Sequence, residues 1–148
     1  MSALEALTDK RSLRLLHILI GCFRAYGMPR AIQVDNETCF NSRLMRGALK
    51  LLGIHLQTTQ PRCPWQSGRI ERFFGTFKAK MHRIVVADFD ELQRRLLEFR
   101  AWYNHVRPHH HLYGRTPAEA WKGADRSIAA PEFYSAWDGL LTGWYFPS

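Results

Sequence analysis

The sequence predicts a helix-rich α/β fold whose β-sheet is incomplete. The order along the chain is helix, strand, helix, strand, loop and further helices, with only two strand patterns before the helical half. A sheet of two strands is marginal by itself, so the pattern lacks strands that would complete it. The 148 residues suffice for one domain with a sizeable core.

The first helix and the first strand lead to an acidic residue. Residues 3–26 carry dense apolar side chains among basic ones, which indicates a largely buried helix. We expect an interruption near Thr8–Lys10 and a natural stop at Gly27. The short apolar strand 31–34 then runs directly into Asp35.

The second helix and strand follow at once. Residues 41–52 predict a helix with Asn41 or Ser42 as its N-cap and Gly53 at its end. Residues 54–58 alternate apolar and polar side chains, as a half-buried strand does.

The remaining segments are a loop, helices and a tail. Residues 59–68 contain two prolines, a serine and a glycine, which favours an irregular loop. We expect helices at 69–83 and 89–103 and a short helix opened by a capping box at 116–119. The last 25 residues, 124–148, form an aromatic-rich tail.

Charge is the most informative bulk property. The net charge of +8 and the pI near 9.9 suit a polyanionic partner, although a merely soluble basic protein has the same balance.

No apolar run spans a bilayer and no signal peptide is evident, which predicts a cytoplasmic protein with no membrane partner. The three cysteines form no CxxC pair, so we expect reduced thiols.

Two carboxylates occupy positions suited to metal chemistry. Asp35 ends a predicted strand and Glu71 begins a predicted helix, with 35 residues between them (71 − 35 − 1). Hard oxygen ligands in such places hold Mg²⁺ or Mn²⁺ and support two-metal phosphoryl transfer. Taken singly, Asp35 is also explained as a turn former and Glu71 as a complement to the helix dipole.

Several motifs together resemble one family. Residues 27–36 (GMPRAIQVDN) and 64–78 (PWQSGRIERFFGTFK) resemble the segments around the second and third acids of DDE-type transposase and retroviral-integrase catalytic cores. Their spacing is that of the same family, which includes bacterial insertion-sequence transposases. Residues 103–109 (YNHVRPH) and Thr116-Pro117 resemble its closing signature. The resemblance implies that this signature packs against the core.

The resemblance implies a ribonuclease H-like integrase core over residues 1–123, followed by the tail. Asp35 and Glu71 would be catalytic metal ligands for Mg²⁺ or Mn²⁺, and the parent enzyme would cleave and join DNA strands. Its partners would be double-stranded DNA (transposon ends and target DNA) and further copies in a homo-oligomer, in the nucleoid-associated cytoplasm.

The family's first catalytic Asp, carried on a three-stranded meander, has no counterpart in the pattern. Asp9 is too close to Asp35 for three strands to lie between them, so it is not assigned the role. Glu37 stands where the family usually has Gly, and it adds negative charge near the site. We therefore expect this chain to be a poor catalyst alone. We also expect it either to self-associate or to be marginally stable.

Basic residues around Glu71 are candidates for DNA contact. Lys78 lies seven residues on, about 20° around a helix, and Arg69 and Arg72 flank the acid. A solvated helix face explains Lys78 equally well, and it is the better explanation for Arg69 and Arg72. Trp65 and the tail aromatics are weaker candidates for stacking on bases, and packing explains the tail better.

The histidines at 105–111 lack paired cysteines, which argues against a zinc site. Two alternatives to the enzyme remain: a catalytically inactive DNA-binding remnant, and a fragment that regulates the full enzyme by joining its oligomer.

Overall fold

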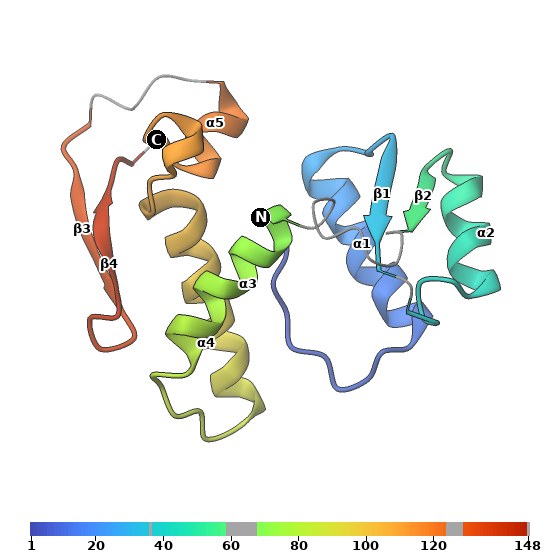
Figure 1. The fold of residues 1–148 in the computed structure, drawn as a ribbon, viewed down its shortest axis with the longest axis horizontal. Helices are drawn as coiled ribbons and strands as arrows, with labels where there is room; N and C mark the ends of the chain where they lie inside the picture. Colours follow the sequence, from blue (N-terminus) through green and yellow to red (C-terminus); the bar gives the residue numbers. More distant parts are fainter. Residues whose placement is uncertain (36, 59–67, 124–128, 148) are drawn as a thin grey trace. The chain divides into compact units, whose positions relative to one another are not determined.

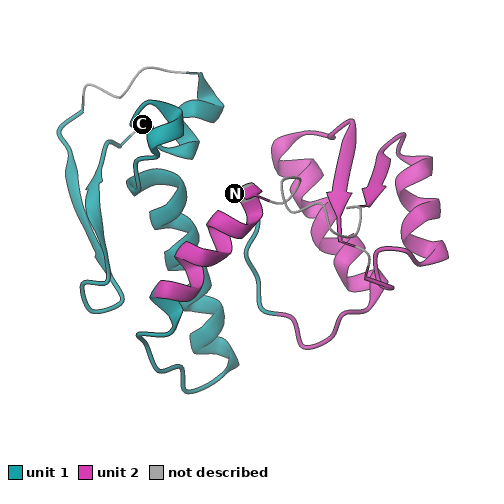
Figure 2. Ribbon diagram, in the orientation of Figure 1, with its two compact units in different colours: residues 1, 3–6, 80–148 teal, residues 2, 7–79 magenta. Residues whose placement is uncertain are grey.

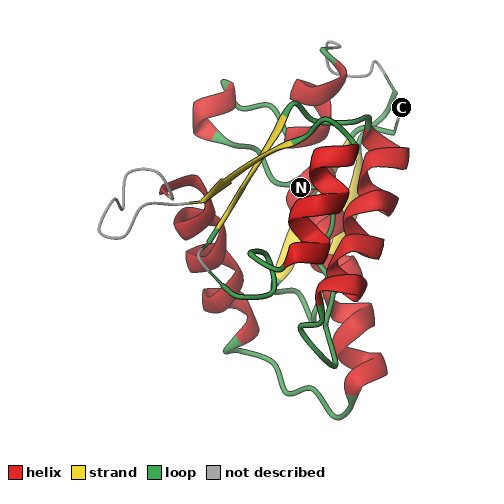
Figure 3. Cartoon of the chain, turned by 90° about the vertical axis from the view of Figure 1, so that its right-hand side faces the viewer, coloured by secondary structure: helices red, strands yellow, loops and turns green. Residues whose placement is uncertain are grey.

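A computed structural model describes residues 1–35, 37–58, 68–123 and 129–147. The described chain is rich in helices and has four short strands (Figure 1, Figure 3). It forms two compact units: unit 1 contains residues 1, 3–6 and 80–148, and unit 2 contains residues 2 and 7–79 (Figure 2). No helix of the described residues is both long and apolar enough to cross a membrane.

Unit 2 is a two-layer α/β arrangement. Helix α1 (Ser12–Tyr26) precedes strand β1 (Ala31–Val34), and helix α2 (Arg43–Leu51) connects β1 to strand β2 (His55–Thr58). The strands pair in parallel, with Ala31 opposite His55. The predicted strands and second helix are therefore present, within one or two residues of their expected bounds.

One apolar cluster holds the layers of unit 2 together. Leu16 of α1, Met45 and Leu49 of α2, and Ile54 before β2 are buried in it. Ile32 of β1 and other half-buried apolar side chains pack against this cluster. Because strand side chains alternate, the face of β1 that bears Ile32 faces the helices while Gln33 is exposed.

The first helix begins later than the sequence predicts. Residues 3–11 are not helical, and α1 starts at Ser12. The carboxylate of Asp9 accepts the backbone N–H of Arg11 at 2.9 Å, which stabilises a local turn that competes with helix. The expectation of a helix from residue 3 was wrong, and the suspected break near Thr8–Lys10 is where the turn lies.

Local capping signals set the other helix ends. The Ser42 hydroxyl accepts the backbone N–H of Met45 at 3.2 Å, so Ser42 is the N-cap of α2. Thr116 and Glu119 form the predicted reciprocal capping box at the start of α5 (Pro117–Lys122). The predicted loop at 59–68 lies outside the described residues except for Gly68, which is helical.

Unit 1 is built on a long helical segment. Helix α3 (Gly68–Met81) crosses from unit 2 into unit 1, and α4 (Phe89–Ala101) follows with Asp88 as its N-cap. A π-helical segment, η2 (Trp102–Val106), extends α4, and a 3₁₀ turn, η3 (His110–Leu112), precedes α5.

The tail forms a β-hairpin, which the sequence analysis did not predict. Strands β3 (Glu132–Ala136) and β4 (Leu141–Tyr145) are antiparallel, and the rings of Phe133 and Trp144 meet edge to face at 5.2 Å. Trp137 in the turn is buried and lies 5.6 Å from the ring of Phe99 in α4. Trp137 of the tail thus builds part of a core, whereas Phe133 and Trp144 are exposed.

Backbone and side-chain bonds hold the hairpin in unit 1. The indole of Trp102 donates to the Thr142 carbonyl at 3.0 Å, and Lys80 donates to the Leu140 carbonyl at 2.6 Å. The cationic groups of Lys80 and Arg107 each lie within 6 Å of the Trp102 ring centre, at 5.6 and 5.7 Å.

The residues of the closing signature have packing roles in unit 1. Asn104 donates to the Met1 carbonyl at 2.8 Å, and Arg107 lies over the rings of Trp102 and Tyr103. His109 is buried with its ring 4.7 Å from that of Tyr103. Burial and the adjacent Arg107 lower the pKa of His109, and a hydrogen bond to the Tyr103 backbone opposes this only in part.

We predict that Gly143→Ala lowers the free energy of unfolding by about 1–3 kcal/mol, as overpacking does. A Cβ at Gly143 would lie 2.6 Å from Cγ1 of Val106, closer than packed atoms approach. Urea unfolding followed by circular dichroism measures the loss, and Gly143→Ala with Val106→Ala should recover part of it. The control is Gly21→Ala on α1, where no atom lies within 4 Å. Equal stability of Gly143→Ala and wild type would refute the close approach.

We also predict that unit 1 loses stability on acidification. The pKa of His109 is lowered from its ordinary 6.5, so below pH 6.5 the unfolded chain binds more protons than the folded one. Stability that is fully present above pH 6.5 is therefore lost as the pH falls towards the folded pKa. Urea midpoints at pH 7.5 and 5.5 should differ less in His109→Gln than in wild type. Identical differences in the two proteins would contradict this.

Candidate functional site

Asp35 lies at the carboxyl edge of the parallel strand pair. It follows Val34 directly, and Val34 is opposite Thr58, the last residue of β2. Its side chain is exposed. The carboxyl edge of parallel strands is where α/β sheets bind ligands, and the packing of Ile32 on the core fixes where this edge lies.

The loop after Asp35 is tied to the start of α1. The Lys10 amine pairs with the Glu37 carboxylate at 2.9 Å, and the Ser12 hydroxyl donates to the Cys39 carbonyl at 2.7 Å. The bond to Glu37 raises the pKa of Lys10, and the negative charge of Asp35 adds to that rise. The extra acid at position 37 therefore has its own cation, which the sequence analysis missed.

Glu71 lies in the first turn of α3 with its side chain exposed. Arg72 and Lys78 are exposed on the same helix, whereas the side chain of Arg69 is outside the described part of the structure. Phe73 and Phe77 stack at 6.1 Å between ring centres along α3. Glu71 and Lys78 are seven residues apart and therefore lie on nearly the same face.

The two acids fit a divalent cation by the chemistry of their oxygens. Among the described residues, no hydrogen bond or ion pair occupies the carboxylate of Asp35 or Glu71. Asp9 differs, because it accepts the Arg11 N–H. Within the same described ranges, no three His, Cys, Asp or Glu side chains gather closely enough to hold a metal. The fit is thus one of donor chemistry, with each acid able to offer hard oxygen ligands.

Positive charge is concentrated in the unit that holds both acids. Unit 2 contains 12 Lys and Arg against 4 Asp and Glu, a net charge of +8 (12 − 4). Unit 1 contains 9 of each and is neutral (9 − 9). The net charge of the whole chain therefore arises from unit 2 alone.

Residues 52–117 match the family model described as "Integrase core domain". This match includes Glu71, Lys78 and the closing signature but ends short of Asp35. An uncharacterised 39.2 kDa protein of insertion element IS476 from Xanthomonas euvesicatoria is 32% identical over 97 residues, which are 65% of this chain. The match spans only 27% of that relative's length.

Solved structures show the same fold. The catalytic core of BIV integrase superposes with a TM-score of 0.61 at 21% identity, covering 79% of this chain and 74% of that core. The HTLV-2 integrase catalytic core, in a trimeric form with magnesium, has a TM-score of 0.57 at 17% identity over 75% and 70% of the two chains. The fold is thus a ribonuclease H-like integrase core, present in part.

We predict that Asp35→Asn and Glu71→Gln each weaken Mn²⁺ binding by at least about tenfold, because each removes one of two hard oxygen ligands. Electron paramagnetic resonance of free Mn²⁺ measures the affinity. Asp138→Asn, at an exposed turn of unit 1, is the matched control and should bind as wild type does. If all four proteins bind Mn²⁺ alike, the two acids are not the ligands.

Proposed function

We propose that this chain, which carries a segment of the integrase core domain, is part of a recombinase that cuts and joins DNA. The observation that carries the proposal is the coincidence of charge and acids: unit 2 holds Asp35, Glu71 and the entire net charge of +8. Lys and Arg side chains bind duplex phosphates with release of counterions, which brings the scissile strand to the carboxylates.

The proposed chemistry needs no covalent bond between protein and DNA. A bound Mg²⁺ or Mn²⁺ would supply a Lewis acid that stabilises charge on the attacked phosphate. Asp35 and Glu71 would hold and orient it, and magnesium in the HTLV-2 integrase core supports this choice of cation. In cleavage, a water oxygen bonds to phosphorus and the 3′-oxygen leaves as a hydroxyl. In strand transfer, a 3′-hydroxyl oxygen bonds to a phosphorus of the target strand, and the 3′-oxygen of the target strand leaves as a hydroxyl.

Basic side chains would position the DNA beside the acids. Lys78 and Arg72 are exposed on the helix that carries Glu71, and Arg69 precedes it. We assign these three residues to phosphate contacts on the strand being processed. Assembly with further copies and residence with the chromosome in the cytoplasm belong to the same proposal, and the trimeric form of the HTLV-2 core supports assembly.

A second candidate is a DNA-binding remnant that does not catalyse. The observation that favours it is the count of ligands, because two carboxylates without a third in the described residues make a weak metal site. A fragment that joins the oligomer of a complete enzyme is a variant of this candidate. In both cases the chain would bind DNA without cleaving or joining its strands.

The test is to incubate the chain with a labelled DNA duplex and Mn²⁺ and to score retention and nicking. Wild type and Glu71→Gln should retain the duplex equally, while nicking falls at least about 100-fold in Glu71→Gln, because the metal ligand is lost. Asp138→Asn should nick as wild type does.

Retention without nicking by wild type would favour the remnant over the enzyme. Nicking that survives in Glu71→Gln would indicate a contaminating nuclease. A chain that neither retains nor nicks duplex DNA would overturn the proposed function itself.

A further inference from the structure

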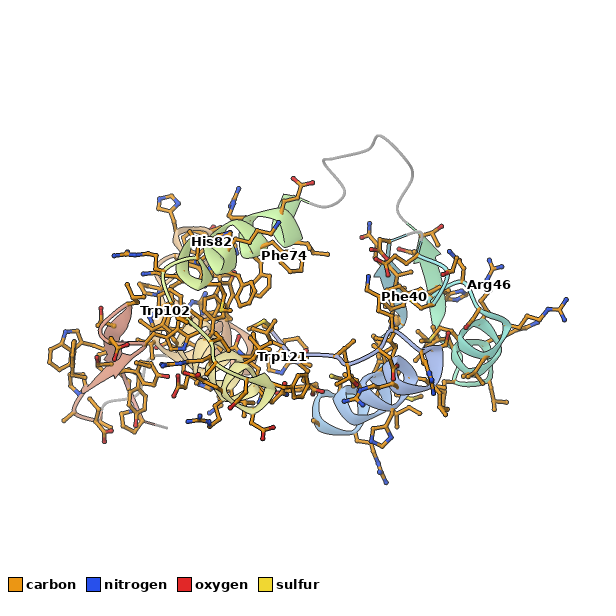
Figure 4. All side chains as sticks on the ribbon, turned by 90° about the horizontal axis from the view of Figure 1, so that it is seen from below. Phe40, Arg46, Phe74, His82, Trp102 and Trp121 are labelled. Carbon is orange, nitrogen blue, oxygen red and sulfur yellow. The ribbon has the colours of Figure 1, made fainter. Side chains whose placement is uncertain are left out.

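Helix α2 has a buried apolar face and an exposed basic face. Met45 and Leu49 are 0% and 1% exposed and face the core of unit 2. At 100° per residue, Arg43, Arg46 and Lys50 fall within about 60° of one another, turned about 80–140° away from the middle of the apolar face, and all three are exposed. The packing that buries one face therefore turns the three cations outwards; Figure 4 labels Arg46 on this helix and Phe40, which packs on the core.

These cations have no acidic partners within the described part of the chain. The ion pairs there involve Lys10 and Arg95 instead. Unit 2 has 12 basic residues against 4 acidic ones, and Glu37 is already paired with Lys10. A set of like charges held on one helix face repels itself unless an anion lies against it. The charge on α2 thus lacks a counterpart in its own unit.

The basic face is unobstructed at its edge. Gly47 lies about 40° beyond Arg43 around the helix, between the cations and the exposed side chains of Leu44 and Leu51, and no atom lies within 4 Å of the place its Cβ would take. A glycine in a helix interior costs about 1 kcal/mol relative to alanine, and its lack of a side chain permits a ligand to approach the backbone. Arg43 and Lys50 are separated along the helix axis by about 10 Å, so this face is long enough to contact more than one phosphate of a strand.

We infer that this basic face (Arg43, Arg46 and Lys50) binds the phosphate backbone of duplex DNA, as a contact surface separate from that on α3. Charge complementarity determines the partner, since three outward cations without acidic partners in the described residues suit the phosphates of a duplex. The contact is independent of base sequence and holds a duplex against unit 2. The inference rests on the proposed function, of which it names a further DNA-binding surface.

The test measures duplex affinity by fluorescence anisotropy against salt concentration. The full chain is compared with the variant Arg43→Gln, Arg46→Gln, Lys50→Gln. Loss of three phosphate contacts should reduce the slope of log Kd against log salt by about 2.7 and raise Kd on the order of a hundredfold at 0.1 M salt. The charge-retaining variant Arg43→Lys, Arg46→Lys, Lys50→Arg should keep the wild-type slope.

The matched control removes three exposed arginines from unit 1: Arg83→Gln, Arg94→Gln, Arg115→Gln. This control changes the net charge by the same amount. Because its three arginines lie outside the proposed surface, the slope of log Kd against log salt should stay within about one of the wild-type slope. Equal losses in the two triple variants would mean that bulk charge alone attracts DNA and would overturn the inference. An unchanged slope in the α2 variant would overturn it too, whereas a wild type that binds no duplex would overturn the proposed function.

Footprinting on the wild-type chain avoids any effect of substitution on folding. Duplex DNA should slow acetylation of Lys50 at least about fivefold and leave Lys122, exposed in unit 1, unchanged. Acetylation of Lys50 at the same rate with and without bound duplex would overturn the inference.

Discussion

Burial of one side of α2 is the constraint on which the rest of unit 2 depends. Met45 and Leu49 fill the space against Leu16 of α1, and this contact fixes the rotation of α2 about its axis. The same cluster receives Ile32, which determines the face and height of β1 and hence the place of Asp35. An apolar contact thus orients both the acid at the strand end and the charged surface on the exposed side of the helix.

Short-range signals in the sequence predicted most element bounds in advance. Ser42 and the Thr116 capping box act on backbone groups two or three residues away, so their effect is visible in the sequence itself. The strand before Asp35 and the helix around Glu71 follow from apolar spacing in the same way. The fold family followed from motifs in a fixed order, and the roles of the two acids stay predictions.

Interactions between distant residues could not be predicted in this way. Lys10 and Glu37 are 27 residues apart, and nothing local to either indicates their pairing. The hairpin was missed although Asp138-Gly139 is a strong turn signal, because the aromatics on each side also suit an unstructured packing tail. Only the docking of Trp137 beside Phe99 distinguishes the two.

The two strand pairs impose different demands on folding kinetics. In the hairpin Ala136 pairs with Leu141 across a short turn, and such pairs close within microseconds. Ala31 and His55 pair in parallel, so the chain between them must form α2 and return before any ladder bond exists. Non-local pairing of this kind is slow, because the chain loses the entropy of loop closure before the stabilising contacts between the strands form. Unit 2, which carries both acids, is therefore expected to set the folding rate of the chain.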